Sequence, residues 1–152
     1  MPLRLQELQD AARARNIELS FHQITKPEEI PATIDAAKAS GAEGLNVLSA
    51  PVLFGNRAVT MQRVAALGLP TIYQFPEEAE EGGFIGYGSR VIQTFRDLLG
   101  AQLVKLLRGV RLADIPIEQP TKFELVINLK TAKALGLTIP ESFLLRADKV
   151  IE

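Results

Sequence analysis

The first half of the chain alternates between segments of helical periodicity and short apolar segments with strand-like composition. The expected order is helix 3–15, strand 17–24, helix 27–41, strand 43–48, helix 55–67, strand 69–73 and strand 84–87. Short connections in this order favour a mainly parallel sheet whose covering helices make right-handed crossovers. The alternation therefore predicts an α/β fold in three layers, α-β-α, with the carboxyl ends of its first strands along one edge.

The stretch from Gly68 to Gly88, GLPTIYQFPEEAEEGGFIGYG, has the composition of a ligand-binding edge. It contains a strand, a break at Pro76, an acidic turn and a second strand that ends in Gly-Tyr-Gly. Small-molecule sites in open α/β sheets lie just outside the carboxyl ends of the strands. Tyr73, Phe75 and Tyr87 stand at these ends, where they are either core residues or a wall on which a ligand stacks.

The glycines of this stretch do not form a nucleotide-binding loop. A dinucleotide fingerprint needs G-x-G-x-x-G between a strand and a helix, whereas here the close pair, Gly86 and Gly88, comes last. No Gly-Lys-Ser/Thr follows, so a Walker loop is excluded as well. Tight turns and close approach of the backbone to a small ligand account better for these glycines.

The acidic cluster of Glu77, Glu78, Glu80 and Glu81 has two interpretations. Paired carboxylates can serve as a general acid and base or hold a hard metal ion. Glutamates in the first turn of a short helix after proline are more often solvated charges favoured by the helix dipole. We expect the solvated role for the last three, and leave open whether Glu77, nearest the strand end, faces a ligand.

No catalytic constellation is evident. The single histidine, His22, lies on the polar phase of the predicted strand 17–24, and Ser49 lacks a G-x-S-x-G elbow. The chain has no cysteine, which excludes disulfides, thiolate nucleophiles and cysteine metal sites. We therefore expect no enzymatic activity, no metal and no cofactor.

Charge and hydropathy narrow the range of partners. The chain has 17 basic and 18 acidic residues, so no broad basic face is expected for nucleic acid or an anionic membrane. The amino-terminal segment carries charges throughout and lacks the apolar core of a signal peptide. We expect a soluble chain without an export signal, which would be cytoplasmic as a free-standing product.

The second half of the chain does not continue the alternation of helices and strands. It predicts a long helix over 89–107, capped by Ser89, and a proline-punctuated connector over 113–120. A strand at 123–129, a short helix at 131–135 and a last helix containing Phe143 follow. We expect these segments to pack on something beyond the first sheet.

Three stretches resemble the ABC-transporter substrate-binding protein family of the tryptophan/tyrosine type. They are LPTIYQFPEEAEEGGFIGYG (69–88), LVKLLRGVRLADIPIEQPTKFELVINL (103–129) and KTAKALGLTIPESFLLRADKVIE (130–152). The run from Glu118 to Leu137 is long and specific, and the earlier part of the chain fits the second half of the same family with less specific residues.

The resemblance implies a lobe of the periplasmic-binding-protein type I kind, with a small molecule held in a hinge cleft between two such lobes. It implies an exported, non-enzymatic protein that hands a solute, an aromatic amino acid in some members, to an ABC permease. On this basis Tyr87 and Gly88 are expected at the cleft or hinge. Tyr73, Phe75 and Glu77 are expected on its wall, with Ser49 and Ala50 at the neighbouring strand end.

The sequence departs from the family pattern in two ways. Family members have two lobes, whereas residues 1–152 have the size of one, with segments within 89–152 that would cross to the missing first lobe. Many members also carry an acidic residue in the loop where this chain has Ala50. An acid there is suited to bind the ammonium group of an amino acid, so its absence argues against a zwitterionic ligand.

A single lobe should expose apolar surface where its partner lobe would sit. We therefore expect a homodimer or larger assembly, which could form by exchange of elements. The alternative to a solute receptor is an oligomeric scaffold that has lost ligand capture together with the first lobe.

Overall fold

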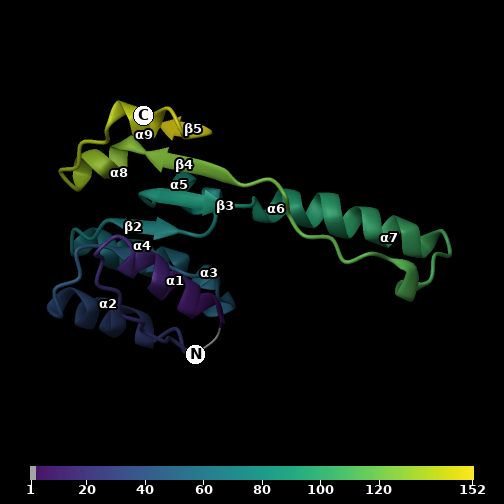
Figure 1. The fold of residues 1–152 in the computed structure, drawn as a ribbon, viewed down its shortest axis with the longest axis horizontal. Coiled ribbons are helices and arrows are strands. Elements are labelled where there is room, and N and C mark those ends of the chain that lie inside the picture. The colour runs from purple at the N-terminus through teal and green to yellow at the C-terminus, as the bar shows by residue number, and fades with distance from the viewer. Residues whose placement is uncertain (1–2) are drawn as a thin grey trace.

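The computed structural model describes residues 3–152 and shows a sheet-containing lobe from which a long helical segment projects (Figure 1). The lobe has five strands: β1 (Leu45–Val47), β2 (Thr71–Tyr73), β3 (Ile85–Gly88), β4 (Glu124–Asn128) and β5 (Lys149–Ile151). They lie side by side in the order β1-β2-β3-β4-β5. The first three are parallel, β4 runs antiparallel to β3, and β5 runs parallel to β4. The expected α/β class with a mainly parallel sheet is confirmed.

Helices cover the two faces of the sheet. Those of the lobe are α1 (Leu3–Arg13), α2 (Glu29–Ala39), α3 (Pro51–Gly55), α4 (Arg57–Ala66), α5 (Pro76–Glu80), α8 (Leu129–Ala134) and α9 (Glu141–Leu144). On one face, Ile30 and Ile34 of α2 and Val64 of α4 form a buried cluster with Leu69, against which Leu45 packs. Side chains of neighbouring strand residues alternate between faces, so Asn46 and its register partner Ile72 point to the other face. Leu8 of α1 lies on that second face, beside the same cleft as Asn46 and Ile72.

Residues 91–122, which we call the arm, extend away from the sheet (Figure 1). The outward leg is a helix in three consecutive segments: α6 (Val91–Thr94), a π-helical turn (Phe95–Leu99) and α7 (Gly100–Leu107). The chain turns at Gly109, where a positive φ of 89° favours glycine, and returns through a 3-10 turn at Leu112–Asp114. Large apolar side chains of the arm are exposed: Ile92, Phe95, Leu99, Leu103, Val104, Leu106, Leu107, Val110, Leu112 and Ile117.

The expected cap of the long helix was wrong. Its first turn begins after Arg90, and no side chain caps it at that residue. The N–H of Val91, which has no acceptor within the helix, instead donates to Oε1 of Glu77, 2.9 Å away. A carboxylate from a different element therefore supplies the acceptor that we expected from Ser89.

The predicted strand over 17–24 was also wrong. The segment has no regular secondary structure, although its apolar and polar residues alternate, and Ile17 and Phe21 are exposed. A strand needs a partner that accepts and donates backbone hydrogen bonds, and no described residue bonds to the backbone of residues 18–24.

Smaller differences concern short elements. The short helix α3 was not predicted; it begins at Pro51, and proline suits the first turn of a helix. The sequence did not predict β5, which has three residues and pairs with β4 at one end of the described sheet. None of the described helices has the length and apolar character needed to cross a membrane.

Candidate functional site

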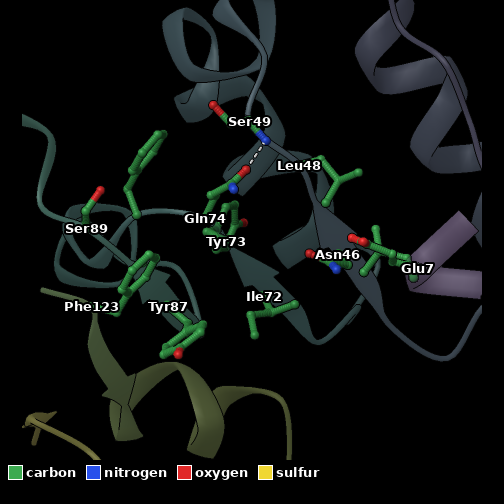
Figure 2. Close-up of a pocket in the computed structure, with 13 residues that line it drawn as sticks. Glu7, Asn46, Leu48, Ser49, Ile72, Tyr73, Gln74, Tyr87, Ser89 and Phe123 are labelled. Carbon is green, nitrogen blue, oxygen red and sulfur yellow. Dashed lines mark hydrogen bonds between the residues drawn. The ribbon is translucent and has the colours of Figure 1, made fainter. Parts of the chain in front are cut away.

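A cleft of about 550 Å³ opens at the carboxyl ends of β1, β2 and β3 (Figure 2). Its lining combines strand-end residues with two residues of α1 and one at the base of the arm. They are Glu7, Leu8, Asn46, Leu48, Ser49, Ile72, Tyr73, Gln74, Phe75, Tyr87, Gly88, Ser89 and Phe123. Glu7 is the one ionisable carboxylate among them, so the lining is nearly uncharged. The place is the one at which parallel α/β sheets bind small molecules.

One hydrogen bond ties two strand ends together across the cleft. The backbone N–H of Ser49 donates to the side-chain oxygen of Gln74 (Figure 2). This donor fixes the amide orientation, because a backbone N–H can face only the oxygen of the amide. The Gln74 Nε2 group makes no hydrogen bond within residues 3–152 and is a free donor at the cleft.

Tyr87 and Phe123 form an aromatic pair at the base of the arm. Their ring centroids are 6.1 Å apart with a tilt of 33°, and each residue is 54% exposed. Tyr87 is the next-to-last residue of β3, shortly before the arm begins, and Phe123 directly precedes β4, where the arm returns. Both line the cleft and can offer ring faces or edges to a planar ligand. Phe123 was not predicted as a site residue. The signal that could have identified it is an aromatic residue directly before β4, the strand that pairs with the strand carrying Tyr87.

The other two predicted aromatics have neighbours inside the protein. Tyr73 is 1% exposed and its ring packs against Gly83, where a Cβ would lie 2.7 Å from the ring. Burial raises the pKa of its hydroxyl, which has no hydrogen-bond partner among the described residues. Phe75 makes an edge-to-face contact with Phe54 at 5.2 Å. Tyr73 therefore borders the cleft as a core residue, with its ring on the opposite face of β2 from Ile72.

The remaining predicted residues lie in different surroundings. Gly88 lies at the cleft, where its backbone comes close to that of Gln74. A Cβ at Gly88 would overlap the carbonyl oxygen of Gln74, so this close contact of the two strand ends requires glycine. Ser49 lines the cleft, whereas Ala50 does not contribute to the lining. Glu77 also lies outside the lining and binds the amino end of α6. Its second oxygen is buried without a hydrogen-bond partner among the described residues.

The other three glutamates of the acidic cluster are not simply solvated charges, which corrects the expectation from the sequence: Glu80 and Glu81 form ion pairs, and Glu78 is buried. Arg90 bonds both oxygens of Glu80, at 2.9 and 3.1 Å, and Lys149 bonds the same carboxylate at 2.8 Å. These contacts, that of Arg90 first, lower the pKa of Glu80 to about 2. Glu81 pairs with Arg57 at 2.5 Å.

Glu78 is the buried member, at 4% exposure, and burial raises its pKa. Its carboxylate accepts the N–H of Phe75 at 3.2 Å. No group of acidic or histidine side chains suited to hold a metal ion occurs in the described part of the chain. The acidic cluster thus fixes α5 and the base of the arm.

A model of the family described as ABC transporter substrate binding protein matches residues 3–151. A search of curated proteins finds no match. Among solved structures, an ABC domain in complex with L-Trp from Streptococcus pneumonia is similar with a TM-score of 0.85 and 23% identity over 97% of this chain. A conserved domain protein from Vibrio cholerae O1 biovar eltor gives a TM-score of 0.82 and 22% identity over 97% of this chain.

A ligand-free, open substrate binding protein with adhesive properties from Clostridium difficile gives a TM-score of 0.64 and 18% identity over 98% of this chain. At these identities the similarity establishes the fold alone. The match covers 50%, 50% and 49% of the three solved chains, so residues 1–152 span about half the length of each.

Proposed function

Because the chain belongs to the ABC transporter substrate binding protein family, we propose that it forms one lobe of a solute receptor that delivers a small molecule to an ABC permease. The observation that carries the proposal is the cleft at the carboxyl ends of β1–β3, with its nearly uncharged lining and exposed aromatic pair. Such a combination of apolar wall and few polar groups is typical of small-molecule sites. The proposed role is binding and transport, without enzymatic turnover, and its place is the periplasm.

The lining supports a ligand with a planar ring and a hydrogen-bond acceptor. Tyr87 and Phe123 would contact the ring, and Gln74 Nε2 would donate to the acceptor. Ser49 and Gly88 would line the same space, with Phe75 and Tyr73 supporting it from behind. An aromatic amino acid fits this description, and one solved relative was crystallised with L-Trp.

The arm supports a two-lobe receptor. We propose that segments within 89–152 cross to a first lobe, which would cover the apolar side chains of the arm and supply the second wall of the cleft. The length comparison supports this architecture, since similar solved chains are about twice as long.

Calorimetry and thermal shift with a panel of aromatic amino acids, other amino acids, nucleobases and aromatic acids test the function. We expect one class of ligand to raise the Tm and Tyr87→Ala and Phe123→Ala to abolish the effect. Phe95→Ala is the matched control, because Phe95 is an exposed aromatic on the arm, outside the cleft. If no compound binds to this chain or to a protein extended by a first lobe, the receptor proposal is wrong.

The exposed apolar residues of the arm favour a second candidate, an oligomeric scaffold without ligand capture. In this case a second copy covers the arm, and a homodimer or larger assembly forms. Light scattering at tens of micromolar distinguishes the candidates: a ligand-insensitive oligomer supports the scaffold, and a monomer that binds ligand excludes it.

A further inference from the structure

The strands present a row of side chains to the cleft on one face of the sheet. Asn46 on β1 is the register partner of Ile72 on β2, and Ile72 is the partner of Ile85 on β3. Side chains two residues apart on a strand share a face, so Gln74 and Tyr87 lie on the same face as Asn46. From β1 to β3 this row extends over two strand spacings, or about 10 Å. A ligand in the cleft therefore meets Asn46 at one end of the row and Tyr87 at the other.

Helix α1 places a carboxylate at the β1 end of this row. Leu8 and Ala12 lie four residues apart on one stripe of the helix; Ala12 is buried and Leu8 borders the cleft. Glu7, next to this stripe, also lines the cleft, and Figure 2 shows it beside Asn46 and away from Tyr87. Among the described lining residues, Glu7 alone carries a negative charge. The β1 end of the cleft is therefore acidic.

The polar groups at this end suit a cation better than an anion. Asn46 is exposed there, and its amide oxygen can accept a hydrogen bond from a ligand, as can the carboxylate of Glu7. No Lys, Arg or His side chain is among the described residues that line the cleft. An ammonium group has only donors and needs acceptors of this kind. A ligand carboxylate would find only the neutral amide donors of Asn46 and Gln74, and Glu7 would repel it.

We propose that Glu7 binds the positively charged amine of a ring-bearing ligand, and that the cleft prefers aromatic amines to the amino acids and the acids with the same ring. The ring contacts Tyr87 and Phe123, and the ammonium group donates to Glu7 and Asn46. Because these groups lie at opposite ends of the row, the ligand carries its charge on a chain and not on the ring itself. The inference rests on the receptor function proposed above and names the class of its ligand.

Calorimetry at low ionic strength with two matched series of ligands tests the inference. The indole series is tryptamine, L-Trp and indolepropionate, and the phenyl series is phenethylamine, L-Phe and phenylpropionate. The protein is the chain of residues 1–152, or that chain extended by a first lobe where only the extended form binds. In the series that binds, we expect the amine to bind most tightly and the acid most weakly.

Replacement of Glu7 should change this order. Glu7→Gln should weaken binding of the amine about tenfold, because a hydrogen bond to a charged acceptor is lost. The same substitution should not weaken binding of the acid, since it removes a repulsive charge. High salt should lower the affinity for the amine much more in the unchanged protein than in Glu7→Gln.

Asp10→Asn is the matched control. Asp10 is a carboxylate one turn further along α1, and it does not contribute to the lining of the cleft. Its replacement removes the same charge from the same helix and should change the affinity for the amine by less than about twofold. Glu7→Asp, which keeps the charge on a shorter side chain, should retain part of the affinity that Glu7→Gln loses.

The outcomes separate this inference from the receptor function. If no compound binds to either protein, both are wrong. If only compounds outside the two series bind, if the acids bind more tightly than the amines, or if Glu7→Gln leaves the affinity for the amine unchanged, the receptor function stands and the inference is wrong. Equal losses in Asp10→Asn and Glu7→Gln would also overturn it, because the net charge of α1, and not contact with Glu7, would then determine the affinity.

Discussion

The lobe and the arm differ in where their apolar side chains lie. In the lobe, Leu69, Val126 and Ile127 are at most 1% exposed and pack between sheet and helices. In the arm, Leu99 and Leu103 are 52% and 55% exposed, although they recur at the spacing of a buried helical face. The same pattern therefore marks a core in one region and an exposed apolar surface in the other.

The two regions are joined by polar contacts. Arg90 bridges Glu80 of α5 and Glu124 of β4, at 2.9 and 2.6 Å, and Glu77 binds the first N–H of α6. Lys122 also pairs with Glu124 at 3.0 Å. Charge-assisted bonds of this kind have specific geometry, so they can orient the arm without burying its apolar face.

The largest expected contrast comes from truncating one apolar residue in each region. Ile127→Ala should lower the free energy of unfolding by about 4 kcal/mol, because it leaves a cavity in a site with 0% exposure. Leu99→Ala should change it by less than about 0.5 kcal/mol. Urea unfolding at low protein concentration measures both values. A Leu99→Ala loss comparable with that of Ile127→Ala would mean that the arm is packed in solution.

Glycine substitutions provide the next contrast. Gly88→Ala should lower the free energy of unfolding by about 3 kcal/mol, because its Cβ would overlap the backbone carbonyl of Gln74. This carbonyl cannot move aside as a flexible side chain can. Gly100→Ala meets no atom within 4 Å and has helical φ, so it should raise the helicity of the arm and leave the lobe's Tm unchanged. Circular dichroism with thermal melting compares the two. If both substitutions changed the Tm equally, the lobe and the arm would not differ in how tightly they are packed.

Local sequence patterns predicted most elements of the lobe but not what each apolar face contacts. The position of Tyr87 at the edge followed from the order of strands, since parallel strands end at one edge, whereas Gly88 was expected at the cleft from the family resemblance. The pairing of Arg90 with Glu80 and of Val91 with Glu77 joins residues 10 and 14 positions apart through the fold, and periodicity carries no such information. The strand predicted at 17–24 has the alternation of a strand, but residues 18–24 have no backbone hydrogen-bond partner among residues 3–152, because pairing is a property of the sheet.

A third, smaller effect concerns the base of the arm. The pKa of Glu80 is lowered to about 2 from 4.5, so its ion pairs stabilise the fold above pH 4.5, and this stability is lost as the pH falls toward 2. Arg90→Met should lower the free energy of unfolding by about 1–2 kcal/mol at pH 7 and reduce its further decrease at acidic pH. Arg111→Met is the control, since its pair with Asp114 is exposed near the tip of the arm. If the free energy of unfolding depended on pH in the same way in Arg90→Met and in the unchanged protein, the Arg90–Glu80 ion pair would not stabilise the base of the arm.

The smallest expected effect separates buried from solvated charge within α5. Burial raises the pKa of Glu78 above 4.5, so ionisation opposes folding, and the group favours the folded state at acidic pH. Glu78→Gln keeps an oxygen to accept the Phe75 N–H and removes the buried charge. It should stabilise the protein by up to about 1 kcal/mol at pH 7, with the gain disappearing below pH 4.5. Glu18→Gln is the control at an exposed position, and it should leave the free energy of unfolding at pH 7 nearly unchanged in the same urea experiments. A loss of stability in Glu78→Gln at pH 7 would instead mean that attraction to Arg57 outweighs burial at this site.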